Sequence, residues 1–293
     1  MSKILFVGLG NMGEPMARNL ASEHVLVVSD ADEEKATNVA RSIEAEVYST
    51  GDLDVDAVIL MLPNSRIVED VLFRIAPCLA DGTLIIDMSS SEPGSTIALQ
   101  EKLRARGIDY VDAPVSGGVV KAESGELSIM CGGTEEAFAR AKPILEPLGK
   151  SLVHIGGPGS GNVAKVLNNL LSATNLAAAA EVLSVADKFG IAPEAMIEVI
   201  NHSTGRSQAT EIKYPKDILT HSWSSGFAFD LMVKDLKIAE RVANNLSVGL
   251  SVTGATLVLV QEARQALGNG RDHTELARFI EENNSVNFSR KER

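Results

Sequence analysis

The sequence predicts an α/β protein with a mostly parallel sheet in its N-terminal part and an all-helical C-terminal part. Two observations support this. Up to about residue 158, short β-branched runs alternate with amphipathic helical stretches, a pattern typical of βαβ units with right-handed crossovers. After the glycine–proline run at 156–159, no convincing strand is apparent. Because 293 residues exceed what one hydrophobic core usually serves, we expect two domains, 1–158 and 159–293.

Each expected element follows from its hydrophobic period. Strands are expected at residues 4–7, 25–29, 57–61, 83–87, 109–111, 127–131 and 152–155. Helices are expected between several of them, at 12–21, 67–75, 95–106 and 135–145. The C-terminal domain is expected to open with a long helix over 160–189, closed by Gly190 and followed by Pro193. Further helices are expected at 193–201, 208–219, 231–244, 252–267 and 274–282.

Composition and charge restrict the function. The 27 Lys and Arg residues against 39 Asp and Glu give a formal net charge of −12, which repels phosphate backbones, so no nucleic-acid partner is expected. The two cysteines, Cys78 and Cys131, lack metal-type spacing, and no metal is expected. The apolar run at 4–9 is too short for a signal peptide, and later apolar stretches are interrupted short of a membrane span. These features predict a cytoplasmic protein without a membrane partner.

A glycine-rich segment follows the first expected strand and opens the first expected helix. Gly8 allows a tight turn, Gly10 lets the backbone approach a pyrophosphate, and Gly13 permits close packing of helix on strand. A GxGxxG alone can mark a structural turn, but this strand–turn–helix context favours dinucleotide binding in a Rossmann-type domain. The expected cofactor contacts are Gly8, Leu9, Gly10, Asn11, Met12 and Gly13.

Asp30 stands at the end of the second expected strand, where dinucleotide-binding domains place an acidic residue. Its carboxylate can accept hydrogen bonds from ribose hydroxyls and repels a 2′-phosphate. The next residue is Ala31, so no arginine stands there to bind that phosphate. These features favour NAD over NADP. The alternative is an exposed turn aspartate, since the acidic run 30–34 would suit a surface loop.

Two further segments carry polar groups that could bind a substrate or react with it. In DAPVSGG, at 112–118, Ser116 and two glycines offer a hydroxyl and N–H groups to a carboxylate, although a surface turn explains the segment equally well on chemistry alone. At 159–169, Lys165 and Asn169 are four residues apart and share one helix face. A lysine at the start of an otherwise apolar helix either pairs with another polar group or takes part in catalysis, or it extends its ammonium group to solvent.

Together these segments resemble the β-hydroxyacid dehydrogenase family, of the 3-hydroxyisobutyrate dehydrogenase type. The resemblance is carried by FVGLGNMGEPMARNL at 6–20, DAPVSGG at 112–118, GSGNVAKVLNN at 159–169 and KDLKIA at 234–239. It implies that Lys165 is the catalytic residue and that Asn169 orients it or the substrate. It also implies carboxylate binding by Ser116, Gly117 and Gly118. The implied cofactor contacts are Met61, Leu62, Pro63, Ser90 and Lys234, with Asp235 supporting Lys234.

The implied activity is the oxidation of a small anionic 3-hydroxy acid to its semialdehyde with NAD, Lys165 being the general acid–base. A reductase of a small aldehyde acid, such as tartronate semialdehyde, succinic semialdehyde or glyoxylate, shares the same motifs. A non-catalytic nucleotide-binding relative is disfavoured because Lys165 is present and the chain is acidic. Selection of the substrate's side chain is expected around Asn162, Ser172, Phe229 and Asp230. The segment 252–263 is apolar on more than one helix face, which predicts a homodimer or homotetramer.

Overall fold

The computed structural model describes residues 1–51 and 53–289. The chain divides into two compact units, Met1–Lys165 and Val166–Arg293. The strands all lie in the first unit: β1 (Lys3–Val7), β2 (Val25–Ser29), β3 (Glu46–Val47), β4 (Ala57–Leu60), β5 (Leu84–Asp87), β6 (Asp109–Asp112), β7 (Val115–Ser116), β8 (Leu127–Gly132) and β9 (Gly149–Gly156). The domain boundary at 158 remains a prediction.

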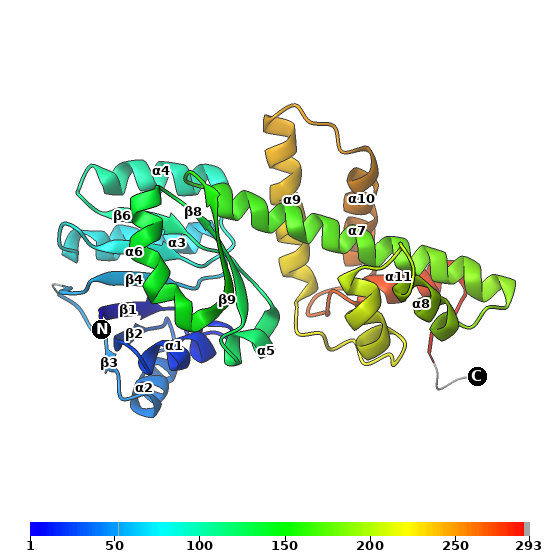
Figure 1. Ribbon diagram of the computed structural model, residues 1–293, viewed down its shortest axis with the longest axis horizontal. Coiled ribbons are helices and arrows are strands. Elements are labelled where there is room, and N and C mark those ends of the chain that lie inside the picture. Colours follow the sequence, from blue (N-terminus) through cyan, green and yellow to red (C-terminus); the bar gives the residue numbers. More distant parts are fainter. Residues whose placement is uncertain (52, 290–293) are drawn as a thin grey trace. The chain divides into compact units, whose positions relative to one another are not determined.

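Among the described residues these nine strands form one sheet with the order β3-β2-β1-β4-β5-β6-β8-β7, and β9 pairs with β8 (Figure 1). The run from β3 to β6 is parallel throughout, while β8 is antiparallel to β6 and β7. The predicted mostly parallel sheet is therefore confirmed. The strand order reverses at β1, and ligands of such sheets bind beyond the carboxyl ends of the strands at this point.

Both faces of the sheet are covered by helices, and each face has its own core. In β1, Ile4 and Phe6 pack into one cluster, whereas the alternating Leu5 and Val7 pack into the other. The first cluster receives side chains from α1 (Gly13–Ala21), α2 (Glu33–Ser42), α5 (Gly118–Glu123) and α6 (Glu135–Leu145). The second receives them from α3 (Ser65–Ile75) and α4 (Pro93–Arg104). Two short 3₁₀ turns, η1 (Ala76–Cys78) and η2 (Glu146–Leu148), follow α3 and α6.

The second unit is built from helices. They are the continuation of α7 (Ser160–Phe189), then α8 (Pro193–Asn201), η3 (Ala209–Ile218), α9 (Phe229–Asn245), α10 (Ser251–Leu267) and α11 (Glu275–Asn284). Its core clusters around one face of α7, with Leu170, Leu176 and Leu183 buried against the other helices. The predicted all-helical C-terminal part is confirmed.

Among the described residues, α7 alone is long and apolar enough to cross a membrane by length and composition. The expectation that apolar stretches are interrupted well short of such a length was wrong for this helix. Small polar residues such as Ser172 and Thr174 lower its mean hydropathy little. This is weak evidence for a membrane, because 56% of the most apolar window is buried and a core helix passes the same test.

Several elements differ from the sequence prediction. The helix expected over 208–219 is a π-helix, η3, with Pro215 inside it. Proline has no N–H to donate and clashes with the preceding turn, so the ordinary α-helical ladder is interrupted there. The helix α2 was not predicted, because it buries only Ala36, Val39 and Ala40 and its apolar stripe is thin. Also missed were the two-residue strands β3 and β7 and the short helix α5.

Candidate active site

The glycine loop after β1 has the shape that a dinucleotide requires. Gly8 has a positive φ of 98°, and a Cβ there would lie 2.3 Å from the Met61 carbonyl oxygen. A Cβ on Gly13 would lie 1.8 Å from the Gly8 carbonyl oxygen. Gly10 differs, since a Cβ there would meet nothing within 4 Å. Two glycines therefore permit close packing, while the third leaves open space beside the loop, which suits an approaching pyrophosphate.

The start of α1 completes this cradle. Its N-terminal flank is the Asn11-Met12 pair, and Met12 makes no side-chain capping hydrogen bond. Helices leave their first N–H groups without intrahelical partners, and anions bind there. The residues present thus fit the pyrophosphate of a nicotinamide dinucleotide.

Asp30 contacts the glycine loop directly. Its Oδ2 accepts a hydrogen bond from the Leu9 N–H at 2.6 Å, and its Oδ1 accepts one from the Asp32 N–H at 3.0 Å. A carboxylate has about four acceptor positions, so both oxygens can accept further hydrogen bonds. Asp30 is therefore a partly buried brace of the loop and not simply an exposed turn residue.

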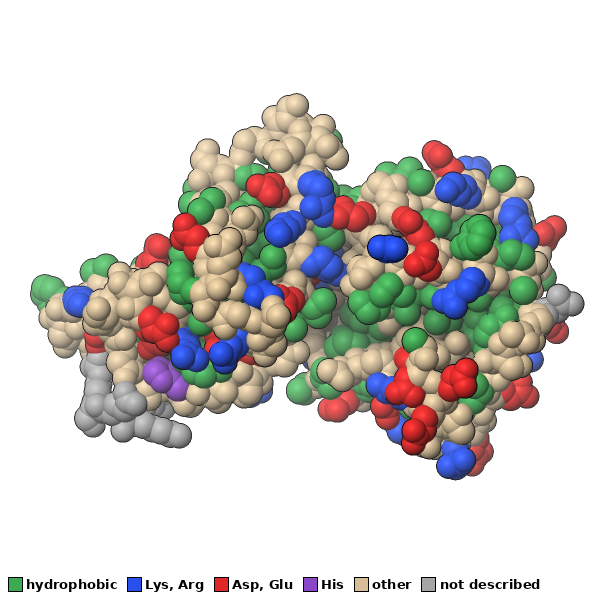
Figure 2. Space-filling view, turned by 180° about the vertical axis from the view of Figure 1, so that it is seen from behind, with side chains coloured by type: hydrophobic (Ala, Val, Ile, Leu, Met, Phe, Trp, Pro, Cys, Tyr) green, Lys and Arg blue, Asp and Glu red, His purple; other side chains and the backbone are tan. Residues whose placement is uncertain are grey.

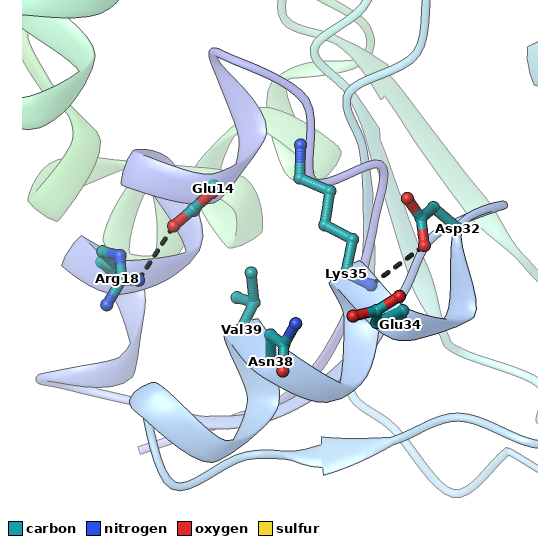
Figure 3. A pocket seen from close by; sticks show the side chains of 7 residues that line it. All are labelled: Glu14, Arg18, Asp32, Glu34, Lys35, Asn38 and Val39. Atoms are coloured by element: carbon teal, nitrogen blue, oxygen red, sulfur yellow. Dashed lines mark hydrogen bonds and ion pairs between the residues drawn. The ribbon is translucent and has the colours of Figure 1, made fainter.

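A hollow of about 310 Å³ lies between α1 and α2, beside the turn that carries Asp30 (Figure 3). Arg18 in its wall pairs with Glu14 at 2.8 Å, and Lys35 is the other basic residue. Two further carboxylates face the same hollow. The full lining is Glu14, Arg18, Asp32, Glu34, Lys35, Asn38 and Val39. With three acidic residues against two basic ones, this hollow is poorly suited to an extra phosphate.

The loops after β4 and β5 are hydrogen-bonded to each other. The Leu62 N–H donates to Ser89 Oγ at 2.9 Å, which joins the 61–63 segment to the serine run. Ser91 Oγ donates to Asp87 Oδ2 at 3.0 Å. Ser89 and Ser91 are buried, whereas Ser90 is partly exposed. Among the three serines, Ser90, the one that the resemblance implies, is thus the accessible one.

Two buried carboxylates lie at the carboxyl ends of neighbouring strands β5 and β6. Asp87 accepts from the Ser89 N–H at 3.0 Å and from the Tyr110 hydroxyl at 2.9 Å. Asp112 accepts from the Gly159 N–H at 2.8 Å and from the Asn162 N–H at 2.9 Å. Burial raises the pKa of Asp87, and it raises that of Asp112 to about 6.

Asp112 therefore holds the first turn of α7 against the sheet. Asn162 strengthens this attachment, because its Oδ1 accepts from the Ser91 N–H at 2.9 Å and its Nδ2 donates to Thr96 at 3.1 Å. Asn162 is fully buried and engaged in these bonds, so it positions the helix and does not face a substrate. Lys165 follows one turn later and is only 8% exposed. The network thus fixes the backbone from which Lys165 projects.

The segment 112–118 runs from the end of β6 through β7 into α5; residues 112–115 are buried, and the exposed Gly117 turns the chain between β7 and α5. Gly117 and Gly118 have positive φ angles of 143° and 71°, which favour glycine. A Cβ on Gly117 would also collide with the Lys121 side chain at 2.7 Å. Ser116 is partly exposed at the end of β7. The turn therefore presents a hydroxyl and backbone N–H groups at the surface of this unit.

The second unit fixes Asn169 and Lys234 through one carboxylate. Asn169 Nδ2 donates to Asp235 Oδ2 at 2.6 Å, and Lys234 Nζ lies 3.5 Å from Asp235 Oδ1. Asp235 and Asn169 are both buried. Since the amide nitrogen of Asn169 is directed to Asp235, the orientation of the amide oxygen is set as well.

The sequence reasoning missed the structural roles of Asp87 and Asp112, although each ends a buried strand and this is a detectable signal. It also missed the contact between Lys213 Nζ and Ser172 Oγ, at 3.2 Å, which forms only when η3 packs on α7. Cys131 is buried, which raises the pKa of its thiol to about 12 and makes it a poor nucleophile. Among the described residues, no group of three or more His, Cys, Asp or Glu side chains could hold a metal ion.

The comparisons with known proteins agree with this geometry. Residues 3–156 match the family described as the NAD binding domain of 6-phosphogluconate dehydrogenase. Residues 159–280 match the family described as the NAD-binding domain of NADP-dependent 3-hydroxyisobutyrate dehydrogenase. The protein is an NAD(P)-dependent oxidoreductase that acts on CH–OH groups. It belongs to the β-hydroxyacid dehydrogenase family, of the 3-hydroxyisobutyrate dehydrogenase type.

Individual relatives cover almost the whole chain. The 2-(hydroxymethyl)glutarate dehydrogenase of Eubacterium barkeri is 42% identical, over 92% of this chain and 91% of the relative. The 2-hydroxy-3-oxopropionate reductase of Escherichia coli is 35% identical, over 95% and 97%. The structure of Mycobacterium tuberculosis 3-hydroxyisobutyrate dehydrogenase with L-serine superimposes with a TM-score of 0.88 at 29% identity, covering 96% of this chain and 99% of that one.

Proposed function

We propose that this enzyme oxidises a small 3-hydroxy acid to its semialdehyde with NAD, and that Lys165 is its acid–base residue. The placement of Lys165 carries the proposal. It is a largely buried lysine on the second turn of α7, directly after the turn that Asp112 holds against the sheet. A buried, rigidly positioned lysine is a functional-site candidate, because burying an ammonium group is otherwise unfavourable.

A bound oxidised nicotinamide would supply the hydride acceptor for the carbinol carbon. Lys165 Nζ, as the amine, takes the hydroxyl proton of the substrate; in reduction the ammonium returns a proton to the developing alkoxide. The Ser116 hydroxyl and the Gly117 and Gly118 N–H groups hold the substrate's carboxylate. Asn169 lies one turn after Lys165 on the same helix face and, fixed by Asp235, orients the reacting groups.

The preference for NAD rests on Asp30 and its surroundings. The remaining acceptor capacity of its carboxylate suits ribose hydroxyls, and its negative charge disfavours a 2′-phosphate. The neighbouring hollow adds Glu14, Asp32 and Glu34, which act in the same direction. The family itself includes both cofactors, since one of the matched descriptions specifies NADP and a Pseudomonas aeruginosa relative at 34% identity is an NAD-dependent L-serine dehydrogenase.

The second candidate is the reduction of a small aldehyde acid by the same residues. It is favoured by the 35% identity to 2-hydroxy-3-oxopropionate reductase and by the 34% identity to 3-sulfolactaldehyde reductase, both of Escherichia coli. The chemistry at Lys165 is reversible, so the two candidates differ in direction and not in site.

The test is steady-state turnover of 3-hydroxyisobutyrate, L-serine, glycerate, 3-hydroxypropionate, 4-hydroxybutyrate and 2-(hydroxymethyl)glutarate with NAD and NADP, together with the reverse reactions. Lys165→Ala is expected to lower kcat on the accepted substrate by about 10²- to 10⁴-fold, because a positioned acid–base group contributes on that order. Its affinity for NAD, measured by calorimetry, is expected to stay unchanged.

Lys188→Ala is the matched control, since Lys188 is an exposed lysine in the last turn of the same helix. It is expected to retain the wild-type rate. A Lys165→Ala enzyme with a near-normal kcat would refute the assignment of Lys165.

A further inference from the structure

Lys213 contacts the helix face that carries Lys165 and Asn169. At about 100° per residue, positions 165, 169 and 172 of α7 fall within an arc of roughly 60°. Lys213 Nζ donates to Ser172 Oγ at 3.2 Å. A cation is thus held on this face about one turn beyond Asn169.

The backbone that carries Lys213 is irregular and firmly anchored. Lys213 lies in the π-helix η3, and π-helical segments are rare and frequent at functional sites. The next residue, Tyr214, is fully buried, and its hydroxyl donates to the Leu176 carbonyl of α7 at 2.7 Å. Tyr214 therefore fixes η3 to α7, and with it the start of the Lys213 side chain.

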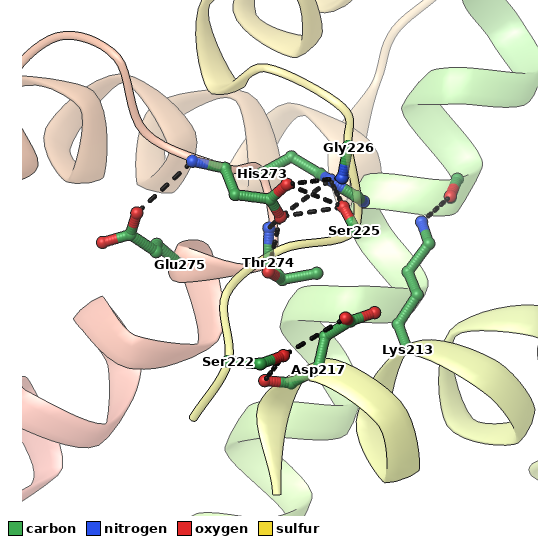
Figure 4. A network of polar contacts seen from close by, with 10 residues as sticks. Lys213, Asp217, Ser222, Ser225, Gly226, His273, Thr274 and Glu275 are labelled. Carbon is green, nitrogen blue, oxygen red and sulfur yellow. Dashed lines mark hydrogen bonds and ion pairs between the residues drawn. The ribbon is translucent and has the colours of Figure 1, made fainter. Parts of the chain in front are cut away.

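Lys213 borders a polar network that contains an unmet hydrogen-bond acceptor (Figure 4). Ser225 Oγ lies 2.8 and 3.0 Å from the two carboxylate oxygens of Asp272, to which it donates. Ser225 Oγ therefore accepts from His273 Nδ1, at 2.9 Å, which leaves the lone pair on Nε2. Nε2 is buried and has no hydrogen-bond partner among the described residues.

The imidazole of His273 adds no positive charge at this place. Burial is the largest of the effects on the pKa of His273 and lowers it. The nearby charge of Lys213 also lowers this pKa, whereas Asp272 opposes both effects. Lys213 is therefore the cation of this cluster, and the unmet acceptor beside it is expected to bind a donor, such as a water or a ligand hydroxyl.

We propose that Lys213 and Ser172 bind a second carboxylate of the substrate, so that this enzyme acts on a dicarboxylic 3-hydroxy acid. This inference rests on the proposed function, because it assigns the reacting hydroxyl to Lys165. In a chain of net charge −12, a dianionic substrate needs cations positioned locally. Lys213, held at Ser172 on α7, supplies such a cation.

The spacing of the two positions along the helix axis suits such a substrate. The Cα atoms of residues 165 and 172 are roughly 10 Å apart at a rise of 1.5 Å per residue. A chain of four C–C bonds from carbinol carbon to carboxylate spans about 5 Å in extended form. Hydrogen bonds of about 2.8 Å at its two ends bring the total to roughly 10 Å.

The test compares 2-(hydroxymethyl)glutarate with 3-hydroxyisobutyrate, because both contain the hydroxymethyl group and the first carboxylate and only the former has a second. Lys213→Met is expected to lower kcat/KM for the dicarboxylic acid by about 10- to 100-fold, the range for a lost charge-assisted hydrogen bond. The same variant is expected to change kcat/KM for 3-hydroxyisobutyrate by less than about threefold. Lys213→Arg is expected to retain part of the preference.

Lys216→Met is the matched control, since Lys216 is an exposed lysine on the same π-helix. It is expected to leave both substrates unaffected. An equal loss on both substrates in Lys213→Met, or no loss on either, would overturn the proposal.

Calorimetric binding separates this proposal from the proposed function. The unreactive probes are 2-methylglutarate and 2-methylbutanoate, which differ in the second carboxylate. Selective loss of 2-methylglutarate binding in Lys213→Met supports the subsite even if no hydroxy acid is turned over, a result that would refute only the proposed function. Unchanged binding of 2-methylglutarate in this variant overturns the subsite.

Discussion

At the scale of single residues, the carboxylate of Asp30 has a structural task in the glycine loop and a proposed task in the selection of the cofactor. Its carboxylate accepts from the Leu9 and Asp32 N–H groups and so braces the glycine loop. Under the proposed preference for NAD, the same carboxylate would distinguish a ribose hydroxyl from a 2′-phosphate. Substitution of Asp30 should therefore change cofactor affinity as well as cofactor preference.

We predict that Asp30→Ser weakens NAD binding by at least about tenfold and lowers the preference for NAD over NADP, because a charge-assisted hydrogen bond to the ribose is lost and phosphate repulsion is relieved. Dissociation constants for both cofactors, measured by calorimetry, provide the check. Glu101→Gln is the control, since it removes an exposed charge on α4, which packs on the opposite face of the sheet from α1 and α2. An unchanged ratio of the two constants in Asp30→Ser would contradict this role.

At the scale of elements, the start of α7 depends on the buried carboxylate of Asp112. A carboxylate at a helix N-terminus satisfies N–H groups and interacts favourably with the helix dipole. Against this, burial raises the pKa of Asp112 to about 6, so ionising it in the folded protein is unfavourable. The element that carries Lys165 is thus attached through a group that titrates near neutral pH.

This linkage predicts the pH dependence of stability. The folded pKa of about 6 lies above the ordinary value of about 3.9, so the folded protein binds the proton more tightly. The contribution of Asp112 to stability is therefore complete below about pH 4 and is lost as pH rises through about 6. Relative to Asp112→Asn, the wild type should lose up to about 1.4 kcal/mol of unfolding free energy per pH unit across this window.

Urea unfolding of both proteins at pH 5, 6, 7 and 8 measures this difference. Asp87 is present in both proteins, so its own titration largely cancels in the difference between their unfolding free energies. A difference in unfolding free energy that is flat between pH 5 and pH 7 would show that Asp112 does not titrate in this range. Between pH 7 and pH 8 the difference should be nearly constant, because the carboxyl is then ionised in both states.

At the scale of the whole molecule, α7 presents an apolar stripe to solvent. Leu171, Val182, Val185 and Phe189 lie on one side of the helix, with Val185 and Phe189 exposed by 72% and 83%. In α10, Leu257 and Val260 are buried, whereas Val252 and Val258 are exposed. Charged side chains of both signs are interspersed elsewhere on the face drawn in Figure 2. Contiguous exposed apolar surface of this kind favours an interface with a second copy.

We therefore predict that the protein is a homodimer or homotetramer and that Val185→Glu shifts it to a smaller species, because a charge would be buried unpaired in the interface. Sedimentation velocity at several concentrations measures the mass. Val25→Glu, at an exposed valine of the first unit, serves as the control and should keep the wild-type mass. A monomeric wild type would exclude the interface.

Much of the fold was predictable, because its signals are local. The buried strands β1, β4 and β5 are short apolar runs, and α7 has a helical period and the C-terminal glycine Gly190. The thin apolar stripe of α2 and the two-residue strands gave no periodic signal. The π-helix η3 was predicted as an ordinary helix, because the position of Pro215 shows where a ladder is interrupted but not which turn replaces it.

The sequence by itself determined the family, the fold class and the segments that carry the chemistry, since the glycine turn, DAPVSGG and the Lys165 helix are contiguous motifs whose geometry is local. Tertiary structure alone decided which of three serines is accessible, that Asp112 holds the start of α7, and that Lys213 reaches Ser172. Each of these depends on contacts between residues far apart in the chain or on burial. Such contacts form only when several elements pack together, so no local pattern encodes them.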